Sequence, residues 1–372
     1  MIPILISIFA YMFNFSPYIQ VVIPVAFIIS FLFSALSIPP IVKIAKKKDL
    51  LVYPNHRDSH KGGIPRLGGL AIFIAIVFSL IFFSGINTVI YFRSILTAII
   101  ILFFIGLLDD LDNIVAWKKL IWEIIAALLV IFGGNMYFTD LYGFMGIHRL
   151  YYIPAVLISI LVYISVINAF NLVDGIDGLA SGLCIQIGLF FGIFFYIRGD
   201  YNFAVTTAIV TGATFGFYLF NVYSKRYKIF MGDSGSLVLG FFIGLMVWRF
   251  CSLNLEPGNG YHIQAAPAVA MGFLTVPLFD TLRVMTLRIW RKKSPFVADR
   301  QHVHHILLDL GFSHAGVRRS LILFNIAMSL LALTIQHFFP SVLFIILFLL
   351  LICLLFTLML FRTKEKRQPT NL

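Results

Sequence analysis

A pair of adjacent aspartates, in the sequence LLDDLDN, follows a long apolar run. Asp109 and Asp110 concentrate negative charge there, with Asp112 and Asn113 close by. A solvated helix end is the plain alternative, but adjacent acids at a helix C-terminus oppose the helix dipole and gain nothing structurally. Carboxylates beside membrane-length apolar runs usually mark a functional site. Because hard oxygen ligands suit Mg²⁺ bound together with a phosphorylated substrate, we expect such a site here.

A second polar stretch, INAFNLVDGIDG, combines amides, acids and glycines. Asn171, Asp174 and Asp177 are three residues apart, so they would share one face of a continuous helix. Gly175 and Gly178 favour a tight turn or a close approach to a ligand instead. Each Asp-Gly pair alone would be an ordinary turn dipeptide. The amides, which offer donors and acceptors to a nucleotide or a metal, favour a binding site.

Two further stretches each support two interpretations. Asp233, in FMGDSGS after Phe230, either belongs to an anion-binding helix start or only caps the helix that follows. In DRQHVHH, Arg300 and the absence of a nearby cysteine favour histidines that hydrogen-bond to phosphate over histidines that bind zinc. These histidines are His302, His304 and His305.

Two other charged features do not decide the function. Lys61, in the glycine-rich HKGGIPRLGG, is either a lipid-facing anchor or a phosphate contact. Asp280 lies deep in an apolar run with Arg283 one turn later. A structural ion pair explains these two residues adequately.

The composition places these residues in a membrane protein. The 372 residues are 60% hydrophobic and 12% charged, with a mean hydropathy of +0.97. A soluble domain is nearer to about half apolar and about a quarter charged. The cysteines, Cys184, Cys251 and Cys353, form neither a disulfide framework nor a metal-binding CxxC pair. A net charge of +12 would suggest nucleic acid in a soluble protein, but in a membrane protein it reports sidedness, and we expect no nucleic acid partner.

Apolar runs organise the chain. A spanning helix needs about 20 apolar residues, and about eleven runs approach that length. The sequence therefore predicts an all-α polytopic membrane protein with about 11 transmembrane helices in one domain, 1–372. A short apolar segment, 1–17, precedes the runs and a basic tail, 362–372, follows them, and the insertion of residues 2–13 is left open. The runs are 19–42, 68–85, 94–108, 118–133, 152–168, 178–197, 201–222, 235–250, 263–287, 317–338 and 341–361.

The loops between the runs alternate between two sides of the membrane. One side receives nearly all the lysines and arginines, among them those at 43–48, 225–228, 288–293 and 362–367. By the positive-inside rule this side is cytoplasmic. The four polar stretches all fall on the same side. We therefore expect one active site on the cytoplasmic face.

Together these stretches resemble a known family, the polyprenyl-phosphate N-acetylhexosamine-1-phosphate transferases of the MraY/WecA superfamily, in glycosyltransferase family 4. LLDDLDN is similar to the family's DDxxD/N element, and NAFNLVDGIDGLASG is similar to its NxxNxxDGxDGLA element. FMGDSGSLVLG is similar to its metal-binding GD loop. The resemblance covers residues 40–320 in matching order. IPRLGG and DRQHVHH resemble the WecA/TagO branch more than the MraY branch.

The resemblance implies an activity. Such an enzyme transfers N-acetylhexosamine 1-phosphate, most often GlcNAc-1-phosphate, from a UDP-sugar to undecaprenyl phosphate and releases UMP. This is the first membrane step of cell-surface polysaccharide synthesis, at the bacterial inner membrane. Mg²⁺ is the implied cofactor, with Mn²⁺ as a substitute. The resemblance leaves open the sugar, the pathway and the oligomeric state, a homodimer included.

The resemblance also implies roles by matched position. Asp233 would be the main Mg²⁺ ligand, with Asn171 beside it. Asp109 and Asp110 would lie by the attacking lipid phosphate, and which of them acts as a base is left open. The implied substrate contacts are Phe230 on uracil, Asp174 and Asp177 near the nucleoside, His302, His304, His305 and Arg300 at the diphosphate or sugar, and, less securely matched, Lys61.

Two other functions compete with this one. The first is an MraY-type enzyme with a muramyl-pentapeptide donor. The second is a secondary transporter, because intramembrane acids often mark coupling sites. A transporter favours charges near the midplane and internal repeats, whereas the acids here cluster at one face and no repeat is visible. A zinc hydrolase is a more distant third.

Overall fold

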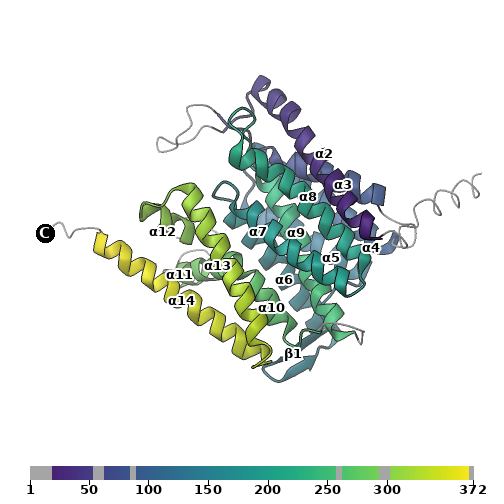
Figure 1. The fold of residues 1–372 in the computed structure, drawn as a ribbon, viewed down its shortest axis with the longest axis vertical. Helices are drawn as coiled ribbons and strands as arrows, with labels where there is room; N and C mark the ends of the chain where they lie inside the picture. The colour runs from purple at the N-terminus through teal and green to yellow at the C-terminus, as the bar shows by residue number, and fades with distance from the viewer. Residues whose placement is uncertain (1–18, 53–62, 84–88, 257–261, 293–301, 368–372) are drawn as a thin grey trace, which may run out of the picture.

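Helices account for most of the chain. The computed structural model describes residues 19–52, 63–83, 89–256, 262–292 and 302–367, and Figure 1 shows how they are arranged. The helices are α2 (Ile19–Lys47), α3 (Gly68–Phe83), α4 (Val89–Asp112), α5 (Ala116–Gly134), α6 (Tyr152–Val173), α7 (Leu179–Ile197), α8 (Tyr201–Tyr223), α9 (Asp233–Leu255), α10 (Ala266–Phe273), α11 (Thr275–Trp290), α12 (Val303–Asp309), α13 (His314–Ile335) and α14 (Val342–Arg367).

The predicted membrane class is confirmed, but the predicted count of eleven spans is not. Among the described residues, eight helices are long and apolar enough to cross a membrane, or nine if α10 and α11 form one broken span. Each predicted run coincides with helix, yet α3 has only 16 residues. The first half of α5 carries Lys118, Lys119 and Glu123, which are costly in lipid. The open question about residues 2–13 lies outside the described residues.

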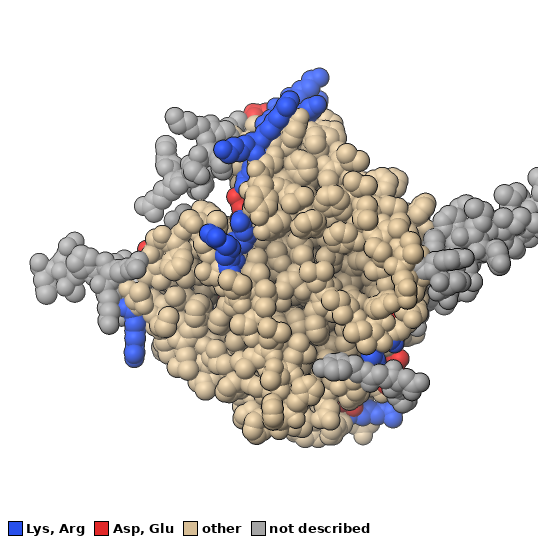
Figure 2. All heavy atoms as spheres, in the orientation of Figure 1, with Lys and Arg blue, Asp and Glu red and all other residues tan. Residues whose placement is uncertain are grey.

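The surface of the molecule matches a bilayer. Figure 2 shows a wide uncharged surface, with lysine and arginine side chains gathered over the C-terminal end of α2. The outer helices α2 and α14 are each only 28% buried across their membrane-length windows. Their outward faces carry leucine and phenylalanine side chains. Apolar exposure on this scale is expected only where lipid covers the protein.

The centre of the bundle is α9. Its membrane-length window is 89% buried, and α3, α4, α6 and α7 pack around it. The helix is apolar on all sides, as a buried helix must be. A Cβ added at Gly240 would lie 2.8 Å from the Cα of Ile167, so the glycine allows α6 to pack closely. This packing places the first turn of α9 next to the C-terminal ends of α4 and α6.

A sharp bend divides the run that the sequence predicts as one span. α10 and α11 meet at Leu274 with an angle of 84°. The Nδ2 of Asn325, in α13, donates to the carbonyl of Phe273 at 2.8 Å, and its Oδ1 accepts from the N–H of Val276 at 3.0 Å. Backbone groups freed by a break in a membrane helix need such partners. The break therefore depends on a residue that is distant in sequence.

The all-α prediction needs one correction. Residues between α5 and α6 form an antiparallel hairpin of β1 (Asp140–Phe144) and β2 (Ile147–Arg149). Met145 and Gly146 both have positive φ, the backbone twist that suits a tight two-residue hairpin turn. The hairpin precedes the N-terminus of α6, so it lies at the end of the bundle away from the C-terminus of that helix.

We predict that Asn325→Leu destabilises the protein. The substitution leaves the Val276 N–H and the Phe273 carbonyl buried without the side-chain partner, which should cost about 2 kcal/mol or more. The measurement is the unfolding midpoint of purified protein in detergent. Thr334→Val, at an exposed hydroxyl of the same helix, is the matched control. Equal midpoints for the two variants would contradict the role given to Asn325.

Candidate active site

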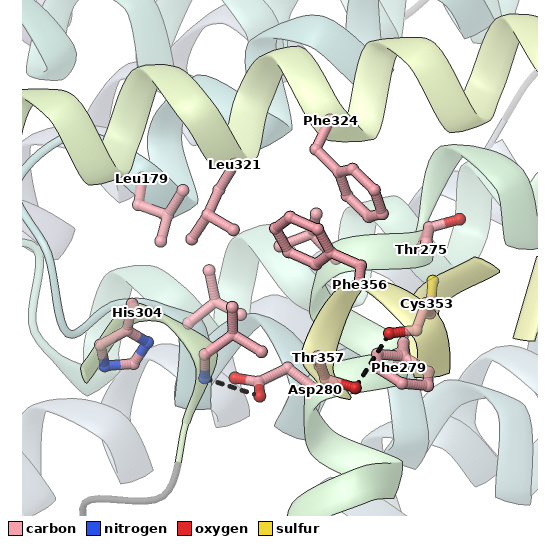
Figure 3. A pocket seen from close by; sticks show the side chains of 13 residues that line it. Leu179, Thr275, Phe279, Asp280, His304, Leu321, Phe324, Cys353, Phe356 and Thr357 are labelled. Atoms are coloured by element: carbon pink, nitrogen blue, oxygen red, sulfur yellow. Dashed lines mark hydrogen bonds between the residues drawn. The ribbon is translucent and has the colours of Figure 1, made fainter. Parts of the chain in front are cut away.

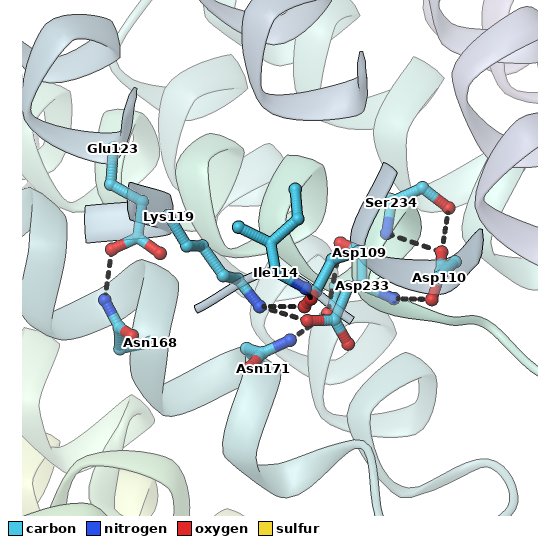
Figure 4. A network of polar contacts seen from close by, with 10 residues as sticks. Asp109, Asp110, Ile114, Lys119, Glu123, Asn168, Asn171, Asp233 and Ser234 are labelled. Carbon is cyan, nitrogen blue, oxygen red and sulfur yellow. Dashed lines mark hydrogen bonds and ion pairs between the residues drawn. The ribbon is translucent and has the colours of Figure 1, made fainter. Parts of the chain in front are cut away.

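A lysine joins two aspartates from distant parts of the chain. Asp109 lies near the C-terminus of α4, Asp233 begins α9, and Lys119 lies near the N-terminus of α5. The Lys119 Nζ is 3.3 Å from Asp109 Oδ2 and forms an ion pair with Asp233 Oδ2 (Figure 4). The Lys119 side chain is only 10% exposed and the Asp233 side chain 32% exposed. Lys119 is thus buried, whereas the carboxylate of Asp233 is partly accessible to solvent.

The second acid of the pair has a different position. Asp110 accepts hydrogen bonds from the N–H groups of Asp233, at 2.7 Å, and Ser234, at 3.0 Å, and from the Ser234 hydroxyl at 2.8 Å. Asp110 therefore caps the N-terminus of α9 from another helix. Asp233 is the first residue of that helix and Gly232 its N-cap, so the simple capping interpretation of Asp233 is wrong.

Two glycines make this approach possible. Gly232 has a φ of +75°, and a Cβ there would lie 2.5 Å from an Asp110 carboxylate oxygen. A Cβ at Gly106 in α4 would lie 2.5 Å from the Cα of Ser234. Glycine is needed at both positions, by conformation in the first case and by space in both.

Asn171 and Asp174 bring the second polar stretch to the same place. The Asn171 Nδ2 donates to the Ser236 hydroxyl at 2.9 Å, and its side chain also hydrogen-bonds to Asp233. Asp174 follows the last residue of α6. Burial raises the pKa of Asp174 well above its ordinary value, and the charges of Asp233 and Asp110 raise it further. Such a cluster of acids favours a cation.

Asp177 is held differently. α6 ends at Val173 and α7 begins at Leu179, so the turn that Gly175 and Gly178 favour is confirmed, and the alternative of a shared helical face is not. Lys228 Nζ lies 2.6 Å from Asp177 Oδ2, and Arg318 donates to the Asp177 carbonyl at 3.1 Å. Asp177 thus fixes the turn against neighbouring segments.

The histidine loop packs against this turn. His302 Nδ1 lies 2.9 Å from Asp280 Oδ2, and the other Asp280 oxygen accepts from the N–H of Val303 at 2.9 Å. The expected Asp280–Arg283 ion pair is also present, at 2.8 Å. Asp280 therefore does more than pair with its neighbour, because it positions the start of α12.

His304 packs against the turn between α6 and α7. A Cβ at Gly175 would lie 2.9 Å from the His304 Nε2, so the ring packs directly on the turn that follows Asp174. Burial, and next the charge of His305, lower the pKa of His304 to about 3. His304 is therefore neutral near pH 7 and can donate one hydrogen bond without carrying charge.

A small apolar cavity lies behind this histidine. It is lined by α11, α12, α13 and α14, with His304 and Asp280 among its polar members (Figure 3). Its volume of about 20 Å³ is close to the space of one water molecule. Phe279, Phe324 and Phe356 form most of the apolar wall. The cavity is too small for a substrate.

The donor set fits Mg²⁺ better than zinc. No three His, Cys, Asp or Glu side chains in the described part of the chain are arranged to hold a metal ion. Mg²⁺ needs only one or two carboxylates when a substrate supplies phosphate oxygens. Asp109 and Asp233 offer these, with the Asn171 amide beside them, and the Lys119 ammonium already marks a cation position between the two acids.

Of three other predicted site residues, one forms no hydrogen bond with the acids among the described residues, and two lie outside those residues. Phe230 is half-buried, and its backbone pairs with Pro65 and Gly68 in the segment before α3. Lys61 and Arg300 lie outside the described residues. Lys119 belongs to the site but was not predicted as a site residue. Its inward direction, which distinguishes it from the exposed Lys118, is visible only in the structure.

Known proteins with a similar sequence identify the family. Residues 92–250, which contain α4 to α9 apart from the first residues of α4 and the last of α9, match the glycosyl transferase family 4 model. The chain is 32% identical over 331 residues to an undecaprenyl-phosphate alpha-N-acetylglucosaminyl 1-phosphate transferase of Escherichia coli K12, covering 86% of each chain. The chain belongs to this family of sugar-phosphate transferases.

Two further relatives agree. The Yersinia pestis protein of the same name is 31% identical over 307 residues, covering 82% of this chain and 80% of the relative. A probable undecaprenyl-phosphate N-acetylglucosaminyl 1-phosphate transferase of Bacillus subtilis is 34% identical over 295 residues, covering 78% and 79%. The family predicted from the four polar stretches is confirmed, although the roles of individual residues remain predictions.

We predict that the two adjacent aspartates differ in what they support. Asp110→Asn places an amide against the N–H groups of α9 and should lower the free energy of unfolding by about 1 kcal/mol. Asp109→Asn relieves repulsion from Asp233 and should lower activity without lowering stability. Unfolding midpoints and turnover of both variants, measured side by side, test this. A larger loss of stability in Asp109→Asn would contradict the assignment.

We also predict a pH-dependent contribution from His304. Its folded pKa of about 3 lies below the value near 6.5 of an unfolded chain. The stability that neutral His304 supplies is therefore complete above about pH 6.5 and is lost as the pH falls toward 3, because only the unfolded chain binds the proton. Between pH 7 and pH 5 the free energy of unfolding of the wild type should fall by about 2 kcal/mol more than that of His304→Gln. The measurement is the free energy of unfolding against pH, and parallel curves for the two proteins between pH 7 and 5 would contradict the prediction.

Proposed function

We propose that this chain transfers N-acetylglucosamine 1-phosphate from a UDP-sugar to undecaprenyl phosphate, releasing UMP and forming a polyprenyl-diphosphate sugar. One observation carries the proposal. Asp109, Asp233 and Lys119 meet at the end of a bundle of membrane-length helices. The names of the relatives, which specify undecaprenyl phosphate and N-acetylglucosaminyl 1-phosphate transfer, support it.

The position of the acids suits a reaction between a lipid and a nucleotide. A polyprenyl phosphate stays in the bilayer with its head group at the surface, whereas a UDP-sugar approaches from water. Only a site at the end of the helices is accessible to both. The excess of lysine and arginine on this side supports a cytoplasmic active site in the bacterial inner membrane. Acids of a transporter, by contrast, would be expected nearer the midplane.

The reaction requires charge to be offset more than it requires a base. An oxygen of the lipid phosphate forms a bond to the sugar-linked phosphorus while the bond from that phosphorus to UMP breaks. Both reactants are anions, so cationic and hydrogen-bonding groups must stabilise the transition state. A phosphate monoester is already largely ionised near pH 7, since its second pKa is about 6. Lys119 supplies a buried ammonium close to the two acids, and neutral His304 supplies a donor near the turn.

Mg²⁺ is the proposed cofactor, with Mn²⁺ as a substitute. Asp109 and Asp233 would hold the ion, with Asn171 orienting Asp233. When bound, the ion would neutralise phosphate charge. Asp110 keeps Asp233 in place through the cap on α9, so in this proposal it is a positioning residue.

The remaining predicted contacts are proposed around this centre. Asp174 lies beside the acids and Asp177 anchors the same turn through Lys228, so the turn is suited to bind the nucleoside. His302 and His305 flank His304 and would face the diphosphate or the sugar. Stacking of Phe230 on uracil and contacts from Lys61 and Arg300 remain predictions from the family resemblance.

We predict that purified protein releases UMP only when undecaprenyl phosphate, Mg²⁺ and the correct UDP-sugar are all present. UDP-GlcNAc, other UDP-N-acetylhexosamines and UDP-muramyl-pentapeptide would be compared, with UMP and lipid-linked product followed in parallel. EDTA should abolish the reaction. Turnover of only the pentapeptide donor would assign the MraY-type activity instead, and no UMP with any donor from folded protein would refute the transferase.

Asp233→Asn gives a sharper test of the site. We expect turnover to fall by at least about 100-fold, the scale on which lost transition-state electrostatics act. Asp140→Asn, in the hairpin at the other end of the bundle, is the matched control and should keep wild-type turnover. Comparable activity in both variants would remove Asp233 from the active site.

A further inference from the structure

Glu123 is a buried carboxylate that the proposed reaction does not use. It lies in α5 with only 1% of its surface exposed. Its Oε2 accepts a hydrogen bond from the Asn168 Nδ2, and that amide also donates to the Ile164 carbonyl at 3.0 Å. Its Oε1 is buried and has no hydrogen-bond partner among the described residues. A buried acceptor without a hydrogen-bond partner costs free energy, so we expect Oε1 to receive a donor in another state of the protein.

The nearest candidate donor is one helical turn away. Lys119 precedes Glu123 by four residues, and side chains at this spacing lie on the same helix face, about 5–6 Å apart at Cβ. Figure 4 shows Lys119 between two groups of side chains, with Asp109 and Asp233 on one side and the hydrogen-bonded Glu123 and Asn168 on the other. The ammonium points to the two aspartates, and the Glu123 carboxylate attracts it more weakly.

A divalent cation and the lysine compete for one position. An ion between Asp109 and Asp233 would meet the Lys119 ammonium, and like charges at contact distance repel strongly in a buried site. The displaced ammonium would be costly without a carboxylate partner. Glu123 offers that partner on the same helix, and only the lysine side chain has to rotate. The cation then balances two carboxylates, while lysine and glutamate balance each other.

We propose that Glu123 is a positioning residue that receives the Lys119 ammonium when a divalent cation binds between Asp109 and Asp233. The inference rests on the metal site of the proposed function. It gives the buried Oε1 a donor in the cation-bound state. It also makes Lys119 a built-in counter-ion that holds the two aspartates together before the cation arrives.

Mn²⁺ binding to purified protein tests the exchange without relying on turnover. Free Mn²⁺ would be measured by its electron paramagnetic resonance signal for wild type, Glu123→Gln, Lys119→Met and the double variant. Glu123→Gln should weaken Mn²⁺ binding about tenfold, the scale on which groups behind metal ligands act. In the Lys119→Met background no ammonium has to move, so the same change should alter the affinity less than about twofold.

The controls separate this role from a structural one. Glu256→Gln makes the same chemical change at a glutamate paired with Arg249 near the C-terminal end of α9, and it should bind Mn²⁺ as the wild type does. Unfolding midpoints would establish that every variant is folded. Equal weakening by Glu123→Gln in both backgrounds, or no weakening in either, would overturn the proposal. A wild type that binds no Mn²⁺ yet releases UMP would overturn the exchange of Lys119 but not the transferase function. A folded wild type that neither binds Mn²⁺ nor releases UMP would overturn both proposals.

Discussion

The cap that Asp110 places on α9 is the constraint from which the rest of the site follows. α9 begins inside the bundle, so its first N–H groups need an acceptor from the protein. Asp110 supplies two carboxylate oxygens from α4, and Gly232 leaves room for them. With Asp110 fixed in this way, the adjacent Asp109 faces Asp233. The pairing of two acids from distant segments is thus a consequence of satisfying a helix terminus.

The cap also determines the charge balance of the site. It concentrates acids at the edge of a low-dielectric bundle, where repulsion between carboxylates is poorly screened. Lys119 offsets part of this charge. Burial raises the pKa of Asp174, and the charges of Asp233 and Asp110 raise it further. In the proposed function, a cation at this site would offset the remaining charge and allow an anionic substrate to bind. The same acids without a cation would repel both phosphates, so metal and substrate binding are expected to be coupled.

The sequence predicted the helices, the membrane class and the meeting of Asp109, Asn171 and Asp233, because alternating spans bring every second loop to one side. It could not predict pairings that depend on side-chain direction. Lys119 was interpreted only as a topology marker, since its partner Asp233 is 114 residues away. The break at Leu274 was missed because its partner, Asn325, lies in another helix. The turn between α6 and α7 was predictable, because Gly175 and Gly178 outweigh the helical spacing of Asp174 and Asp177.

The site is assembled from two parts of the chain, and a glycine lies where they meet. The acids, the lysine and Asn171 all lie within 92–250, the region that matches the family model. The histidines lie outside that region, on a loop positioned by Asp280. One contact between the two parts is that of His304 with Gly175, where a Cβ would lie 2.9 Å from the imidazole Nε2. Because Gly175 has no positive φ, glycine at this position matters less for the conformation of its own turn than for the room it leaves for the neutral imidazole of His304 against the turn that follows Asp174.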